Sequence, residues 1–232
     1  MPPVVKAHMK VLTVHQIGMM EYDRAYHFQQ RLLKQRIEGE IEDTLLILEH
    51  PPTLTFVKSD DLENLLISRN ELQKRGVSLF PTDRGGNITW HGPGQLVGYP
   101  IIDLKERDKD IHKFIFDLQE VIIRTLNDFS IESFRDERHV GVWVGQEKIA
   151  AIGIKVTSWV TKHGFALNIN NDLDHFSLIN PCGIMDRGVT SMARILGRDV
   201  PMGTVVERIL GHFSSVFGTL VEMESNSFSQ VA

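Results

Sequence analysis

The feature that most constrains the fold is a set of three apolar segments in the middle of the chain. Val140–Val144 and Lys148–Val156 are separated by a Gly145-Gln146 turn, and Phe165–Ile169 follows soon after. Short segments rich in Val and Ile, joined by brief polar turns, are typical of β-hairpins, whose strands pair antiparallel. The sequence therefore predicts a largely antiparallel sheet at the centre of the molecule.

Helical patterns surround these strands. The clearest runs from Asp110 to Phe129, where apolar residues keep a 3.6-residue period. Because strands and helices mix without a regular β-α-β alternation, the predicted class is α+β, with a mixed, largely antiparallel sheet flanked by helices. We expect further strands at Val11–Ile17, Thr44–Glu49 and Leu96–Leu104. Further helices are expected near Tyr22–Leu32, at Asp61–Leu66, from Ser68 and Glu71 to Gly76, from Thr190 to Leu196 with Gly197 closing it, and from Thr204 and Glu207 to Phe217.

The bulk composition is that of an ordinary soluble globular protein. Of 232 residues, 42% are hydrophobic and 24% are charged, and a net charge of -5 disfavours an extended nucleic-acid-binding face. No apolar run is long enough to span a membrane, and residues 1–10 lack a signal-peptide core. We expect a single domain over residues 1–221, a flexible tail over residues 222–232 and a cytoplasmic location, with an organelle form after transit-peptide removal left open.

The single cysteine, Cys182, lies in the run Asn180-Pro181-Cys182-Gly183-Ile184. One thiol forms no intramolecular disulfide and no thiolate metal cluster, so it is either a buried core residue or a reactive one. Pro181 fixes the backbone before it and Gly183 lets another group approach, which is how a chain presents a side chain. From these residues alone both interpretations stay open.

A glycine-rich segment from Arg84 to Gln95 is the second candidate. Four of its twelve residues are glycine, and it also carries Arg84, Asn87 and His91. Glycines at this density let backbone N–H groups approach a ligand, and a guanidinium supplies fixed donors. The spacings fit neither a dinucleotide fingerprint nor a phosphate-binding Walker loop. The alternative is a glycine-rich hairpin loop with a structural histidine.

Two further polar groups stand on predicted strands. Alternation along Lys148–Val156 places Lys148 on the face of Ala150, Ile152 and Ile154, and Lys155 on the opposite face. A lysine aligned with an apolar face suits a catalytic amine, but its stem can also extend to water. His163 stands at the entrance of the next strand, where it is either a structural residue or part of a site. Without an HExxH spacing or a second cysteine, we reject a zinc site and expect no metal and no cofactor.

These segments together resemble the lipoyl(octanoyl) transferases. The likeness rests on the blocks RGG…HGPGQ, KIAAIG, HGFALN and NPCGI and on Leu48–Thr53, and it covers about Val11 to Leu196. It implies an α+β fold like that of the catalytic domains of lipoate and biotin protein ligases. One departure from the family pattern is Phe56-Val57-Lys58, where the family often has a glycine followed by a basic residue, and it bears on the shape of that loop.

The resemblance also implies roles for individual residues. It makes Cys182 the nucleophile and Lys148, 34 residues earlier, its acid–base partner. His50, in the segment Leu48–Thr53, and His163 are possible supporting residues, and His91 and His163 either tune the catalytic pair or order the pocket walls. The implied substrate-binding residues are Arg84, Gly85, Gly86, Asn87, Ile88, Thr89, Trp90 and His91, then Ala151, Ile152 and Gly153, and then Gly164, Phe165 and Ala166.

The implied reaction moves an octanoyl group from acyl carrier protein to a lysine of a lipoyl domain. The acceptors are the lipoyl domains of 2-oxoacid dehydrogenase E2 subunits and the glycine cleavage H protein, and the acyl thioester makes ATP unnecessary. Backbone N–H groups near Cys182 and Gly183, or in Gly85-Gly86, are candidate oxyanion donors. Three alternatives remain: an ATP-dependent lipoate or biotin ligase in which Cys182 is incidental, a thioesterase that uses water as acceptor, and an inactive acyl-protein binder.

Overall fold

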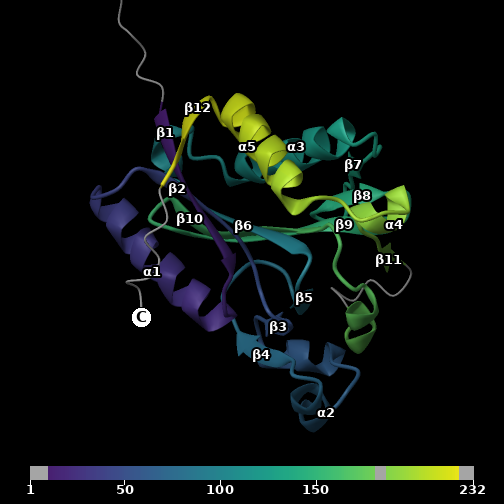
Figure 1. Ribbon diagram of the computed structural model, residues 1–232. Coiled ribbons are helices and arrows are strands. Elements are labelled where there is room, and N and C mark those ends of the chain that lie inside the picture. The colour runs from purple at the N-terminus through teal and green to yellow at the C-terminus, as the bar shows by residue number, and fades with distance from the viewer. Residues whose placement is uncertain (1–9, 181–186, 225–232) are drawn as a thin grey trace, which may run out of the picture.

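A computed structural model describes residues 10–180 and 187–224. Its main feature is a nine-stranded mixed sheet with five antiparallel and three parallel pairings (Figure 1). This confirms the predicted largely antiparallel sheet. The strands, in spatial order, are β12 (Thr219–Met223), β1 (Lys10–Met19), β2 (Asp43–Glu49), β6 (Gln95–Ile101), β10 (Val160–Asn168), β9 (Glu147–Thr157), β8 (Val142–Val144) and β7 (Phe134–Arg135), and β11 (Gly188–Val189) also pairs with β9.

Helices cover both faces of this sheet. Helices α3 (Ile111–Asp128) and α5 (Met202–Phe217) pack on one face and α1 (Tyr22–Glu38) on the other (Figure 1). Central strand β2 shows why both faces need a cover, because its consecutive apolar side chains point alternately to opposite faces. Leu45 and Ile47 join the core under α3 and α5, whereas Leu46 and Leu48 join the core under α1. The central strands are therefore apolar on both sides.

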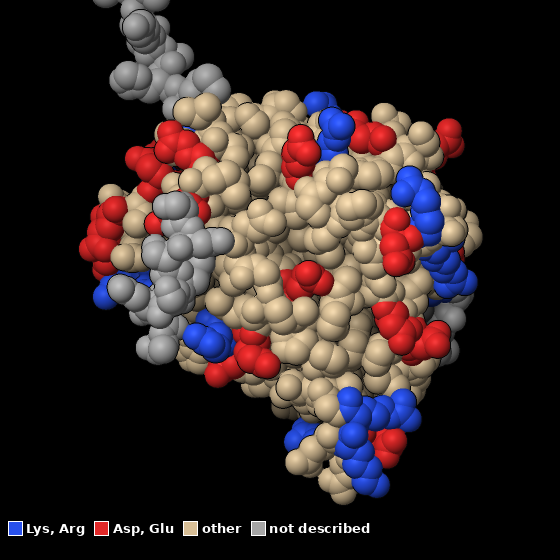
Figure 2. Space-filling view, in the orientation of Figure 1, with Lys and Arg blue, Asp and Glu red and all other residues tan. Residues whose placement is uncertain are grey.

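A smaller lobe hangs from the main sheet. It consists of the sheet β4-β3-β5, the 3-10 helix η1 (Ser59–Asn64) and α2 (Arg69–Lys74), with β3 at Thr53–Phe56, β4 at Ser78–Pro81 and β5 at Thr89–His91. Ser68, from the predicted capping box, is the N-cap of α2, since its hydroxyl accepts the N–H of Glu71. On the face in Figure 2, Lys and Arg gather at the end of this lobe.

The 3-10 helix η3 (Asp174–Leu178) and the residues after it connect the lobe to the rest of the chain. Leu65 forms a β-bridge with Ile179, and the Asn180 N–H donates to the Asn64 carbonyl at 2.8 Å. Val57 lies on the way into η1, where its N–H and that of Lys58 are both bound by the Asp61 carboxylate. The departure at Phe56-Val57-Lys58 is thus an ordered turn.

Several element boundaries differ from the predictions. The expected helix Asp61–Leu66 is η1, which ends at Asn64 because Leu65 turns extended to meet Ile179. The predicted strand Leu96–Leu104 ends at Ile101, since the Asp103 carboxylate caps the 3-10 helix η2 (Leu104–Glu106). The last helices also begin elsewhere: α4 spans Met192–Leu196 after a Ser191 cap, and α5 starts at Met202 after Pro201, so Thr204 is not its cap.

The C-terminal segment differs most from its prediction. Glu222 and Met223, placed by sequence in a flexible tail, belong to β12 and pair in parallel register with Thr13 and Val14 of β1. The Glu224 N–H continues the ladder by donating to the Val14 carbonyl. Within residues 10–180 and 187–224, no helix has the length and apolarity needed to cross a membrane.

Candidate active site

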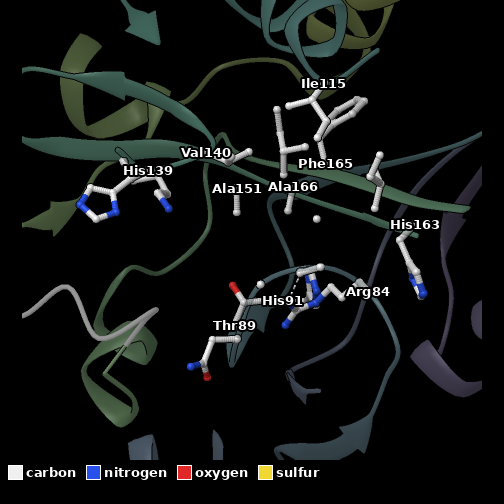
Figure 3. A pocket seen from close by; sticks show the side chains of 18 of the residues that line it. Arg84, Thr89, His91, Ile115, His139, Val140, Ala151, His163, Phe165 and Ala166 are labelled. Carbon is white, nitrogen blue, oxygen red and sulfur yellow. Dashed lines mark hydrogen bonds between the residues drawn. The ribbon is translucent and has the colours of Figure 1, made fainter. Parts of the chain in front are cut away.

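A cavity of about 450 Å³ lies between strands β9 and β10, the loop after β4, and the first turns of α3. In Figure 3, His139 and Val140 lie at one end of it and His163 at the other. All but one of the predicted substrate-binding residues line the cavity: Arg84, Gly85, Gly86, Asn87, Ile88, Thr89, His91, Ala151, Ile152, Gly153, Gly164, Phe165 and Ala166. Lys148 and His163 line it too.

Trp90 is the exception, and its predicted place in the pocket is wrong. It lies on β5 between Thr89 and His91, and strand alternation turns its side chain to the opposite face. There the indole is 2% exposed and stacks on His175 with ring centroids 4.3 Å apart. Trp90 therefore belongs to the core of the lobe.

The glycine-rich loop lies directly on the backbone of β9. The Gly85 N–H donates to the Ile154 carbonyl at 2.8 Å, and a Cβ added to Gly153 would lie 2.5 Å from the Gly85 oxygen. Gly153 pairs with Gly164 of β10, where a Cβ would meet the Gly98 carbonyl oxygen. These glycines let three backbones approach one another, and so they set the width of the cavity.

The side chain of Arg84 is anchored to the lobe. One terminal nitrogen donates to the Thr55 carbonyl at 3.0 Å and to its hydroxyl at 2.9 Å, and the other donates to the Gly85 carbonyl. The guanidinium thus fixes the loop to β3 while it contributes positive charge to the cavity wall.

The hydrogen bonds of His91 define which of its nitrogens carries the proton. The amide nitrogen of Gln95 donates to the Trp90 carbonyl and to Asn168, so the Gln95 oxygen accepts from Nδ1 of His91 at 2.8 Å. Burial, together with neighbouring His50, lowers the pKa of His91 well below its usual value. His91 is therefore neutral, with the lone pair on Nε2.

His50 acts on the cavity through Tyr99. Its Nδ1 donates to the Met20 carbonyl at 2.7 Å, so its Nε2 accepts the Tyr99 hydroxyl at 2.8 Å. Burial lowers the pKa of His50 to about 4. His50 itself does not line the cavity, whereas Tyr99 does. This places His50 behind the wall, where it orients a tyrosine that sequence reasoning missed.

Lys148 stands at the end of the cavity marked by Val140. A Cβ added to neighbouring Gly141 would lie 3.3 Å from its Cε, and its Nζ lies 4.9 Å from the centre of the Trp143 ring. The register between β8 and β9 shifts here, so that Ile149 and Ala150 are both buried in one core. Simple alternation therefore does not fix the direction of Lys148. Lys155 is exposed near Asp83, 3.4 Å away.

Cys182 lies outside the described residues. The described chain before it ends at Asn180, which is bonded to Asn64 of the lobe. After it, Gly188 and Val189 form β11 and pair with Glu147 and Lys148. The two ends of the undescribed segment thus lie at the lobe and beside Lys148, but the distance from Cys182 to Lys148 stays a prediction.

Further cavity residues come from elements that are far apart in the chain. Tyr22 begins α1, Tyr99 lies on β6, and Ile111 and Ile115 lie in the first turns of α3. Arg138, His139, Val140 and Ile154 complete the lining. The Asp136 carboxylate shapes the segment at the Val140 end, because it accepts the N–H groups of Arg138 and His139 and contacts Arg187 at 2.6 Å. Among the described residues, no cluster of His, Cys, Asp or Glu could hold a metal ion.

Comparison with known proteins gives a consistent set of relatives. Residues 21–214 match the family model of the lipoyl protein ligase A/B catalytic domain. The chain is 51% identical to the octanoyltransferase of Caldicellulosiruptor saccharolyticus over 209 residues, and this alignment covers 89% of each chain. Its fold resembles that of a lipoate-protein ligase A bound with ATP, with a TM-score of 0.76 at 14% identity over 94% of this chain and 90% of the other. The biotin protein ligase of Aquifex aeolicus gives a TM-score of 0.51 at 15% identity, over 90% of this chain and 70% of the other.

Proposed function

The chain belongs to the lipoyl protein ligase A/B catalytic domain family, and from that premise we propose that it is an acyltransferase that moves octanoyl groups onto lipoyl domains. One observation carries the proposal. In a chain half identical to an octanoyltransferase, a mostly apolar cavity of about 450 Å³ has a lysine at one end. Such a cavity suits a short acyl chain whose reactive end lies at Lys148.

The proposed donor is octanoyl-acyl carrier protein and the proposed route is covalent. Lys148 as ammonium stabilises the Cys182 thiolate, which attacks the thioester carbonyl carbon. The bond from that carbon to the phosphopantetheine sulfur breaks, and the departing thiolate takes a proton from Lys148. An octanoyl-Cys182 thioester and a neutral Lys148 amine result, so no ATP is needed.

The second half of the reaction uses the neutral amine. The acceptor lysine of a lipoyl domain, in an E2 subunit or the glycine cleavage H protein, arrives protonated and gives its proton to Lys148. Its amine then attacks the octanoyl thioester, an amide forms, and the bond to the Cys182 sulfur breaks. The nitrogen loses its second proton to water as the amide forms, and the thiolate and the ammonium are thereby restored.

The hydrogen bonds of the loop narrow the choice of oxyanion donors. The Gly85 N–H already donates to Ile154, so it is not available to a tetrahedral intermediate. The remaining candidates are the Gly86 N–H and the backbone N–H groups near Cys182 and Gly183, and we favour the latter because they belong to the residues that carry the attacking sulfur.

The octanoyl chain is proposed to extend from Lys148 towards His163. Apolar side chains of α3, β9 and β10 line this path, with Ile115, Ile152 and Phe165 on one wall. Each methylene buried there stabilises the complex by about 0.8 kcal/mol, so discrimination between chain lengths is graded.

The carrier protein is proposed to dock on the lobe. Arg69, Lys74 and Arg75 are exposed on or next to α2, where Glu71 is the single acidic side chain, and the exposed acids Asp60 and Glu63 lie on η1. This gives a local positive surface on a chain of net charge -5 (Figure 2). Acyl carrier proteins are acidic, and the lobe also supplies the cavity residues Ile88 and Thr89.

Intact-protein mass spectrometry tests the proposal directly. Wild type incubated with octanoyl carrier protein is expected to gain an octanoyl adduct that hydroxylamine removes, and Cys182→Ala is expected to gain none. The main rival is a ligase, because a solved structure with this fold is bound with ATP. Transfer that survives Cys182→Ala and requires ATP would establish the ligase and exclude the covalent route.

A further inference from the structure

We propose that Asp83 is a positioning residue that clamps the glycine-rich loop onto β10 and thereby sets which acyl chain lengths the cavity accepts. The role in chain-length selection rests on the proposed function, whereas the contact between the loop and β10 does not. Asp83 precedes Arg84, the first loop residue that lines the cavity. No motif of the sequence marked it as part of the site.

The clamp is a cluster of charges between the loop and the sheet. One oxygen of the Asp83 carboxylate lies 2.9 Å from Nζ of Lys162 and 2.9 Å from Nε2 of His163, and the other lies 3.4 Å from Nζ of Lys155. Lys162 and His163 are neighbours on β10, and their side chains are 2% and 1% exposed. The carboxylate therefore bonds the loop to two buried groups of the central sheet.

The backbone conformation at His163 allows Asp83 to contact both Lys162 and His163. In an extended strand, neighbouring side chains point to opposite faces, so Lys162 and His163 would not meet one carboxylate. His163 instead has a left-handed φ of 58°, which a non-glycine residue adopts at a cost in strain. The Gln29 side chain holds it there by accepting the His163 N–H at 2.8 Å.

The buried charge of Lys162 stabilises the contact with Asp83. Buried Lys162 also lies 4.8 Å from the centre of the Tyr26 ring, and Asp83 is the acid that pairs with it. Although burial alone would raise it, the hydrogen bonds from Lys162 and His163 hold the pKa of Asp83 well below its usual range. A lysine this deeply buried favours the conformation in which Asp83, and with it the loop, lies on β10.

The place of the clamp gives it a role in specificity. His163 marks the end of the cavity opposite Val140 (Figure 3), and Lys148 lies at the Val140 end, beside Gly141. The tail of an acyl chain that reacts near Lys148 therefore ends beside the clamp. The same loop contacts β9 through the Gly85–Ile154 hydrogen bond. Releasing Asp83 would free the loop where the cavity closes over the tail, while the reacting end keeps its geometry.

Two variants separate the clamp from general stability. Asp83→Ala leaves Lys162 buried without its acid, so a lowered thermal midpoint is expected for that reason alone. The double variant Asp83→Ala with Lys162→Met removes the buried charge as well and is expected to recover most of the thermal midpoint. Asp128→Ala is the matched control, because Asp128 has similar exposure and a 2.9 Å contact to His212 but lies on the α3–α5 side of the sheet.

Hydrogen–deuterium exchange tests the clamp without reference to function. Peptides that cover residues 82–91 are expected to exchange at least tenfold faster in the double variant than in wild type, and unchanged in Asp128→Ala. Unchanged exchange in the double variant overturns the clamp. If wild type transfers no octanoyl group, the proposed function fails, and the exchange result still decides the clamp.

Kinetics test the consequence. Wild type is expected to favour octanoyl over hexanoyl carrier by about fourfold per missing methylene, the factor that corresponds to one buried methylene. It is expected to disfavour decanoyl carrier because the clamped loop leaves no room for the longer tail. The double variant is expected to flatten this preference and to raise KM for octanoyl carrier, with KM for the lipoyl domain and kcat little changed. A preference as steep as that of wild type, with faster loop exchange, overturns the specificity role and leaves Asp83 as a structural contact only.

Discussion

The close approach of the glycine-rich loop to β9 gives the sharpest prediction, for Gly153→Ala. In wild type a Cβ on Gly153 would lie 2.5 Å from the Gly85 oxygen, whereas ordinary contacts begin at 3.4 Å. The loop must therefore move away by about 0.9 Å, the difference between these two distances. The blocking atom is a backbone oxygen, so no side-chain rotation relieves the contact.

The energetic cost follows from what this displacement breaks. The Gly85 N–H bond to Ile154, 2.8 Å long, is stretched beyond hydrogen-bonding range. Losing that bond costs about 1 kcal/mol, and overpacking adds roughly 1–3 kcal/mol. Because a misplacement of about 1 Å in a binding wall can lower activity about 100-fold, we expect a fall of that order in kcat/KM for octanoyl transfer.

The assay is octanoyl transfer from carrier protein to a lipoyl domain, measured beside thermal unfolding. Gly211→Ala is the control, since Gly211 lies on helix α5 with nothing within 4 Å of an added Cβ. It is expected to keep wild-type activity and to gain roughly 0.5–1 kcal/mol from helix propensity. Wild-type transfer by Gly153→Ala would refute the argument that this contact sets the cavity wall.

Three further predictions concern other parts of the molecule. Trp90→Ala is expected to lower the free energy of unfolding by roughly 3–5 kcal/mol, as measured by urea unfolding. The chain-length preference, measured by competition between acyl carriers, is expected to stay unchanged because the indole packs in the lobe and not in the cavity. The folded pKa of His50, about 4, lies below its ordinary value of 6.5, so its contribution is complete above pH 6.5 and is lost as the pH falls towards 4. That loss is about 3 kcal/mol, and His50→Gln should flatten the pH dependence of unfolding by this amount. Changing Arg69, Lys74 and Arg75 to Glu is expected to raise KM for octanoyl carrier at least tenfold and to weaken its salt dependence, whereas an unchanged KM would place carrier docking elsewhere.

Elements that depend only on neighbouring residues were predicted correctly from sequence patterns. The long period of α3, the Ser68 cap and the β8–β9 turn all follow from neighbouring residues, and the structure confirms them. Pairing between distant segments was not visible. The end of strand β12, Glu222 and Met223, was placed in a flexible tail, and it becomes a strand because β1, some 200 residues earlier, offers it an edge.

The site shows the same division. The glycine-rich loop and the β9 and β10 motifs identified most of the cavity wall, because their unusual residues lie close together in sequence. Trp90 was misplaced because the three-residue strand β5, and hence its alternation, was not foreseen. Tyr22, Tyr99 and Asp83 were missed, since each is ordinary in its own segment and meets the cavity or its clamp only through the tertiary fold.

The lobe and the cavity share a residue. Ile88, which is fully buried, belongs to the hydrophobic core of the lobe and also lines the cavity. An acyl chain in the cavity therefore adds contacts to a core that also includes Leu72 of α2, although it does not touch that helix. If an acyl chain occupies the cavity as proposed, local opening of the lobe and occupancy of the cavity are thermodynamically linked, and the bound chain makes α2, the proposed docking helix, harder to unfold.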